Sequence, residues 1–339
     1  MQRTLAVMRR LCAVFACAVC AFAGCGVAGV AGAAEAELLR VNLFPTAKQL
    51  PFLLGIERGI FARHGIRLDL QYTENSTTQR AALADGTVDI VHSAVDNAVA
   101  MVEMAGKDVV IVMGGDSGSN EFIVQPHLNT FADLRGKILV VDATDTAFAL
   151  QAKKILANHG LREDVDYRIK AIGRGAQRLQ AMIDDKSHAA AIMNPPFSVQ
   201  AVQMGMKSLG RTVDLLGPYQ SAGVFVMRSW GREHGPLLEK YLASYVESLR
   251  GVFDPANRAD CVRLLMAQLK LSKDEAESTY RLLLDPQIGY VRDARLSPEG
   301  FRATLALRAE IENKGGALPP PEKYLDLSYY QRAIATLPR

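Results

Sequence analysis

The stretch FARHGIRLDLQYTENSTTQRAALADGTVDIV (residues 61–91) has a counterpart later in the chain, LANHGLREDVDYRIKAIGRGAQRLQAMIDDKSHAAAI (residues 156–192). Each contains a His-Gly pair after a helix-like run, then a strand-like run, a polar loop and a Gln-Arg pair in a short helix. Apolar alternation and helical periodicity in this order predict a strand, a helix and a second strand. The chain is therefore expected to build one α/β unit twice.

The rest of the chain fits this interpretation. It has 339 residues, of which 49% are hydrophobic and 22% charged, enough for two lobes with cores of their own. From residue 38 onward strand-like and helix-like runs alternate, which predicts βαβ units and a mainly parallel sheet. Residues 51–65 are expected to form one helix, because Pro51 suits its first turn and Gly65 its end. Beyond residue 235 mainly helices are expected.

The first residues have the layout of an export signal. Arg3, Arg9 and Arg10 precede 24 residues without a charge, and small residues end the stretch. A membrane-spanning helix is the alternative, since this length would suffice for one. The many glycines favour a cleaved signal over residues 1–33.

Two details of this leader remain open. Met8 is an alternative start to Met1. Cys25 ends FAGC, which partly matches a lipoprotein box and offers a lipid anchor in place of ordinary cleavage. Either way, the mature protein is predicted to reach the periplasm.

Cysteine usage and charge limit the possible partners. Four of the five cysteines lie in the leader, which leaves only Cys261, with no disulfide partner and no companions for structural zinc. Its helical neighbours predict a small buried hydrophobic residue. Removing residues 1–33 removes three arginines, so 36 basic residues balance 36 acidic ones. A nucleic-acid partner is not expected from such a balance.

Four segments together resemble a known family. They are PFLLGIERGIFARHGIRLDL, AALADGTVDIVHSAVDNAVA, FADLRGKILVV and AAIMNPPF. In order and spacing they are similar to the solute-binding proteins of nitrate-, taurine- and sulfonate-type ABC importers, a family that also includes binding proteins for thiamine-precursor pyrimidines. The resemblance covers nearly the whole mature chain.

The resemblance implies an α/β chain with the type II periplasmic-binding-protein fold, two lobes joined by two crossing strands. Lobe 1 would be residues 37–121 plus 224–339, and lobe 2 residues 122–223. The hinge would lie near EFIVQ and GVFVM. The implied partners are a small ligand and an inner-membrane ABC permease with its ATPase, and the implied state is a monomer without cofactor or metal.

Polar loops after the predicted strands supply the candidate ligand-binding residues. Parallel sheets bind ligands beyond the carboxyl ends of their strands, and helix N-termini there offer free N–H donors. The candidates are Thr46, Lys48, Gln49, Asn75, Ser76, Ser93, Asp96, Asp142, Thr144, Arg174 and Asn194.

These candidates do not name the ligand. Lys48 and Arg174 would suit an anion, whereas Asp96 and Asp142 would suit an amine or a donor-rich heterocycle. Ser76 and Thr144 could equally be helix N-caps. Sulfonates, nitrate, aromatic carboxylates and pyrimidines all stay open. Replacing Asp96 or Thr144 by alanine is expected to weaken binding without unfolding the protein.

Enzymatic alternatives have weaker support. GDSGS (residues 115–119) resembles a serine-protease stretch but lies in a βαβ pattern, and GRGAQR (residues 173–178) lacks the third glycine of a dinucleotide fingerprint. The histidines show no metal-ligand spacing, and the cysteine-rich cluster of the related pyrimidine synthases is missing. The sequence therefore predicts a binding protein that is not an enzyme; a periplasmic enzyme of the pyrimidine-synthase-like branch and a ligand-sensing subunit remain the alternatives.

Overall fold

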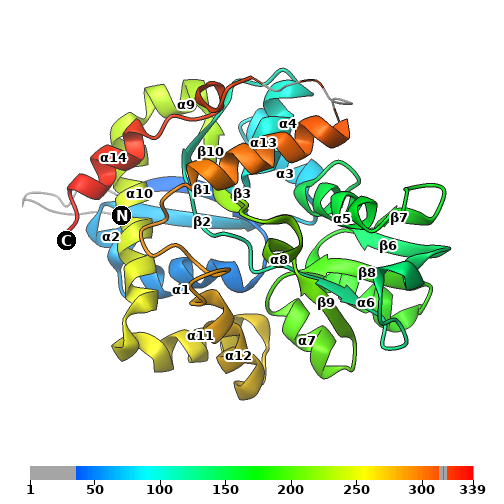
Figure 1. Cartoon of the computed structure of the whole chain (residues 1–339). Coiled ribbons are helices and arrows are strands. Elements are labelled where there is room, and N and C mark those ends of the chain that lie inside the picture. Colours follow the sequence, from blue (N-terminus) through cyan, green and yellow to red (C-terminus); the bar gives the residue numbers. More distant parts are fainter. Residues whose placement is uncertain (1–35, 313–315, 317–318, 339) are drawn as a thin grey trace, which may run out of the picture. The chain divides into compact units, whose positions relative to one another are not determined.

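The computed structural model describes residues 36–312, 316 and 319–338. The predicted export signal and Cys25 lie outside these residues. Two five-stranded sheets organise the described part (Figure 1). The strands of sheet 1 are β1 (Glu37–Leu43), β2 (Ile66–Tyr72), β3 (Ile90–Ala94), β4 (Val109–Met113) and β10 (Ala222–Met227). The strands of sheet 2 are β5 (Glu121–Val124), β6 (Lys137–Val141), β7 (Tyr167–Ala171), β8 (His188–Met193) and β9 (Lys207–Arg211).

The two sheets share one topology. Sheet 1 has the order β2-β1-β3-β10-β4 and sheet 2 the order β7-β6-β8-β5-β9. In each sheet a single strand, β10 or β5, runs antiparallel to its neighbours. The first repeated stretch forms β2, α3 (Ser76–Ala84) and β3, and the second forms β7, α6 (Gly175–Asp184) and β8. The predicted duplication is therefore confirmed, with equivalent places in the two sheets.

The helix expected over residues 51–65 is interrupted. The chain forms α1 (Leu50–Glu57) and a short α2 (Ile60–Arg63). Gly59 between them has a φ of 65°, a left-handed conformation that glycine adopts without a steric penalty. One helix was predicted because Gly59 was not treated as a break.

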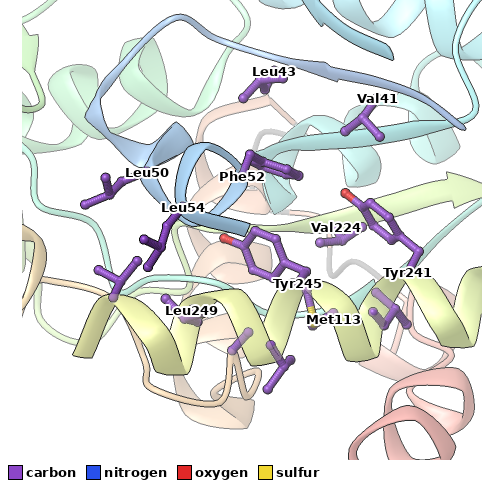
Figure 2. Close-up of a cluster of buried hydrophobic side chains, with 14 of the residues drawn as sticks. Val41, Leu43, Leu50, Phe52, Leu54, Met113, Val224, Tyr241, Tyr245 and Leu249 are labelled. Atoms are coloured by element: carbon purple, nitrogen blue, oxygen red, sulfur yellow. The ribbon is translucent and has the colours of Figure 1, made fainter. Parts of the chain in front are cut away.

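Helices cover both sheets, and the chain beyond residue 235 is mainly helical, as predicted. The remaining α-helices are α4 (Val95–Glu103), α5 (Ala147–Asn158), α7 (Phe197–Gln203), α8 (Thr212–Leu216), α9 (Arg228–Glu233), α10 (Gly235–Phe253), α11 (Arg258–Leu269), α12 (Lys273–Leu283), α13 (Pro298–Glu312) and α14 (Ser328–Ala335). Figure 2 shows α10 presenting Tyr241, Tyr245 and Leu249 to Phe52 of α1 and to the strands of sheet 1. This packing forms the larger core.

The chain passes between the sheets twice, over residues 114–120 and 217–221. Each crossing comes just before the strand that was expected to cross, because β5 and β10 each lie wholly within one sheet. The crossings are bonded to each other: the amide of Ser221 and the side-chain amide of Gln220 both donate to the carbonyl of Asp116, at 3.2 and 3.3 Å. They therefore form one connected link between the sheets.

Cys261 is fully buried in the core of sheet 1, as predicted. Burial raises the pKa of its thiol to about 12, so the thiol stays protonated. None of the helices in the described ranges is long and apolar enough to cross a membrane.

Candidate functional site

A pocket lies between the two sheets, beyond the ends of their parallel strands. Its volume is about 920 Å³ with the open mouth included. Residues that follow β1, β3 and β4 line one side, and residues that follow β6, β7 and β8 line the other. Its polar lining consists of Thr46, Lys48, Ser76, His92, Ser93, Asn97, Asp116, Asp142, Thr146, Arg178, Asn194 and Ser221.

A hydrogen-bonded network joins the two sides of the pocket. The hydroxyl of Ser76, in the first turn of α3, donates to Asp142 Oδ2 at 2.7 Å. Thr146 donates to the other carboxylate oxygen, also at 2.7 Å. Asn97 Nδ2 donates to Ser76 and Ser93, each at 3.2 Å, while its Oδ1 is buried without a partner among the described residues. Asp142 is therefore held by one hydroxyl from each side.

The two cations of the pocket differ in their partners. Lys48 Nζ donates to Asp116 Oδ1 at 2.8 Å, so its charge is compensated. Arg178 on α6 is 2% exposed, and its Nη1 donates to the carbonyl of Gly173 at 2.7 Å. Its Nη2 donates to the carbonyl of Ile192 at 3.5 Å, whereas its Nε has no hydrogen-bond partner, and its guanidinium forms no salt bridge with a carboxylate of the described residues. Burial lowers the pKa of Arg178, although nearby Asp142 opposes this.

The first turn of α5 adds further donors on the same side. No side chain caps it, because the Thr146 hydroxyl turns to Asp142 instead. Ala147 and Phe148, the first two residues of α5, line the pocket, and the Phe148 ring centroid lies 5.5 Å from the Arg178 guanidinium carbon. Free N–H groups at a helix start carry a partial positive charge. Arg178 and α5 together form a positively polarised corner.

Aromatic rings line much of the other side. Phe52, His92 and Tyr245 pack on one another, with the His92 ring centroid 4.8 Å from Phe52 and 4.6 Å from Tyr245. Phe44 and Tyr290 also line the pocket. Burial lowers the pKa of His92 to about 3, so the ring is neutral at physiological pH.

The structure brings six of the sequence-predicted residues to this pocket: Thr46, Lys48, Ser76, Ser93, Asp142 and Asn194. They come from separate loops, and the duplicated topology places those loops around one cavity. That these residues bind ligand remains a prediction.

The other five predicted residues lie elsewhere. Gln49 is buried and accepts from the Tyr72 hydroxyl at 2.6 Å, and Asn75 caps α3. Thr144 is exposed to solvent, and Arg174 pairs with Glu74 at 2.6 Å. They follow strands as expected, but none of them is among the residues that line the pocket.

Asp96 departs most from its predicted role. Both its carboxylate oxygens accept from Arg308 of α13, at 2.6 and 2.7 Å, and both side chains are at most 2% exposed. Its neighbour Asn97 faces the pocket. Successive residues on a helix point about 100° apart, so only one of the two can face the cavity. The pairing with Arg308 makes Asp96 a structural residue.

Sequence reasoning missed several lining residues. Arg178 belongs to the repeated Gln-Arg pair, which is a signal for it, but the position of Arg174 in the polar loop makes Arg174 the cation that the sequence predicts. Asp116 lies in GDSGS, whose only resemblance in the sequence is to a protease stretch. Tyr245 and Tyr290 come from the helical C-terminal region, where nothing local in the sequence marks them. Within the described ranges, no three His, Cys, Asp or Glu side chains are placed to hold a metal ion.

Comparison with known proteins gives one family. The family model described as "ABC transporter, phosphonate, periplasmic substrate-binding protein" matches residues 51–226. The matched segment contains both repeated stretches and most of the pocket lining. Among curated proteins, none matches this chain significantly.

Solved structures give the same fold. The periplasmic nitrate-binding protein of Synechocystis superposes with a TM-score of 0.74 at 13% identity, over 89% of either chain. The alkanesulfonate-binding protein of Xanthomonas axonopodis bound to MOPS superposes with a TM-score of 0.67 at 19% identity, over 85% of this chain and 96% of its own. The zinc-bound ligand-binding component of an ABC-type import system from Staphylococcus aureus superposes with a TM-score of 0.71 at 13% identity, over 88% of this chain and 99% of its own. The predicted type II periplasmic-binding-protein fold is thus confirmed.

Proposed function

Because the chain belongs to the family of periplasmic substrate-binding proteins of ABC transporters, we propose that the solute it captures for import is a small organic anion. The acidic group of this solute would sit against Arg178 and the start of α5. The rest of it would lie between the aromatic rings of sheet 1. Delivery to the membrane permease follows from the family; the nature of the solute is our proposal.

The single observation that carries the proposal is that the buried guanidinium of Arg178 has carbonyl acceptors but no carboxylate partner among the described residues. A buried charge without a counter-ion is costly, so buried arginines are normally paired. Lys48 already has Asp116, and Asp142 already accepts two hydroxyls. A carboxylate, sulfonate or phosphonate oxygen would pair with Arg178 and accept from the free N–H groups of α5.

The aromatic lining supports an organic solute. Phe44, Phe52, Phe148, Tyr245 and Tyr290 contribute apolar surface that a bare inorganic ion would leave unused. Two similar structures are those of nitrate-binding and alkanesulfonate-binding proteins, which agrees with an anionic group. Proteins of this fold that bind anions therefore offer a parallel for the proposed solute.

Several further features belong to the same proposal. We infer binding without turnover, a monomer, a partner ATPase that powers the permease, and an export signal over residues 1–33, with lipidation at Cys25 as the alternative. Residues 114–120 and 217–221 would be the hinge between lobe 1 (37–121 plus 224–339) and lobe 2 (122–223), and closure would couple to binding.

Isothermal titration calorimetry of the purified protein tests the solute class. The panel pairs benzoate, benzenesulfonate, phenylphosphonate and nitrate with the neutral analogues benzamide, benzenesulfonamide and phenol. We expect at least one organic anion to bind and the neutral analogues to fail. Arg178→Met should abolish that binding, whereas Arg168→Met, on the exposed side of β7, should preserve it. Binding of neutral analogues, or tight binding by the Arg178 variant, would refute the proposal.

A further inference from the structure

We propose that His92 donates a hydrogen bond to the bound solute from Nδ1, with its tautomer set by Tyr241, so that the preferred anion also carries an acceptor away from its acidic group. The inference rests on the proposed function and refines it. Arg178 belongs to the side of sheet 2, and His92 to the side of sheet 1. A solute held by both would have one acidic end and one neutral, accepting end.

His92 lies where the core of sheet 1 borders the pocket. It lies in β3, and its side chain packs on Phe52 of α1 and Tyr245 of α10. All three residues line the pocket. His92 is itself only partly buried, which agrees with its place in the pocket lining.

Tyr241 sets the tautomer. Its hydroxyl lies 2.7 Å from His92 Nε2, and the residue is fully buried. Burial raises the pKa of the Tyr241 phenol well above its usual value, so the phenol keeps its proton. The hydroxyl has no other partner in the described chain, so its proton is bonded only if it donates to Nε2. The proton of the neutral imidazole is then on Nδ1.

Nδ1–H is left without an acceptor among the described residues. The only bond that the His92 ring makes there is the one to Tyr241. The charged residues that line sheet 1's side, Lys48 and Asp116, are bonded to each other. Figure 2 shows Tyr241 and Tyr245 rising from α10 on the side of Phe52. The His92 ring packs against all three of these aromatic rings. A solute acceptor is the group that would complete the bonding of His92.

Nuclear magnetic resonance of protein labelled with ¹⁵N-histidine tests the tautomer without any solute. We expect the His92 signals of an Nδ1–H imidazole that stays neutral from pH 8 to pH 5. Tyr241→Phe removes the donor to Nε2 and should mix the two tautomers. A protonated His92 in this range, or an Nε2–H tautomer in the unmodified protein, would overturn the inference.

Calorimetry with two probes of similar shape tests the solute contact. 4-Acetylbenzoate carries a carbonyl acceptor where 4-isopropylbenzoate has only methyl groups. We expect the acetyl compound to bind at least tenfold more tightly. His92→Asn keeps an N–H near the position of Nδ1 and should retain the preference, whereas His92→Phe should lose it.

The outcomes separate the two proposals. Equal binding of the two probes, abolished in Arg178→Met, would leave the proposed function standing and refute the role of His92. If nitrate were the only anion to bind, the role of His92 would be refuted as well. Failure of every anion to bind would refute the proposed function, and the inference would fall with it.

Discussion

The hydroxyl of Ser76 donates to Asp142 at 2.7 Å, and these two residues belong to opposite sides of the pocket. Ser76 opens α3, which follows a strand of sheet 1, whereas Asp142 follows β6 of sheet 2. Both are buried. The bond therefore joins the two sides of the pocket, and under the proposed hinge closure it would form only when they meet.

Ser76→Ala should weaken solute binding through this closure. The variant loses the bond in the closed state only, since water solvates Asp142 when the pocket is open. The loss of about 1.5 kcal/mol would lower affinity roughly tenfold. Calorimetry with the tightest organic anion measures it, and small-angle scattering should show a larger ligand-free radius of gyration. Thr77→Ala, on the exposed face of α3, is the matched control; unchanged affinity in Ser76→Ala would contradict the coupling.

Thr146 and Thr144 form a second matched pair. Thr146 donates to Asp142 at 2.7 Å in the pocket, whereas Thr144 is exposed to solvent. Valine has the shape of threonine without its hydroxyl. Thr146→Val should lower affinity by up to about tenfold, because Asp142 is then held in place by one hydroxyl fewer, and a bond to a charged group is worth at least about 1.5 kcal/mol. Thr144→Val should leave affinity unchanged, contrary to the expectation from sequence, and equal effects in the two variants would show that this placement of the pocket is wrong.

Asp96→Ala is expected to damage the fold more than the pocket. It would remove the two bonds from the buried Arg308 guanidinium to Asp96 and leave Glu312, at 3.3 Å, as its carboxylate partner, which costs up to about 3–5 kcal/mol of unfolding free energy. Urea denaturation measures this loss. Asp96→Leu combined with Arg308→Met removes both charges and should recover most of the stability. A stable single variant with weakened binding would instead restore the role predicted from the sequence.

The sequence predicts the sheets better than the pocket, for physical reasons. Alternation and helical periodicity report which segments form strands and helices, and strand-end loops follow from the topology. The direction of one side chain in such a loop depends on its packing. Asp96 and Asn97 are neighbours, yet one meets α13 and the other the cavity. Only the packed structure decides between them.

Residues that reach the pocket from distant elements could not be predicted at all. Tyr245 comes from α10 and Tyr290 from beyond α12, and both line a cavity formed mainly by strand-end loops. Arg178 is an intermediate case. The repeat marks it, but its missing partner, which distinguishes it from Arg174, becomes visible only when the surrounding contacts are known.

The buried imidazole of His92 should make the stability of the protein depend on pH. Burial lowers its pKa to about 3 in the folded state, against about 6.5 in the unfolded chain. Below pH 6.5 the unfolded chain therefore binds one more proton than the folded protein. The contribution of His92 to stability is fully present above pH 6.5 and is lost as the pH falls toward 3.

Between pH 6.5 and pH 5, this loss amounts to about 1.6 kcal/mol of unfolding free energy. Urea denaturation of the unmodified protein and of His92→Phe, at matched pH values, measures it as the difference between their two pH slopes. The five other histidines contribute equally to both proteins and cancel. If unfolding free energy fell equally with pH in the two proteins, His92 would titrate normally in the folded state. The packing of Phe52, Tyr241 and Tyr245 around its ring should prevent this.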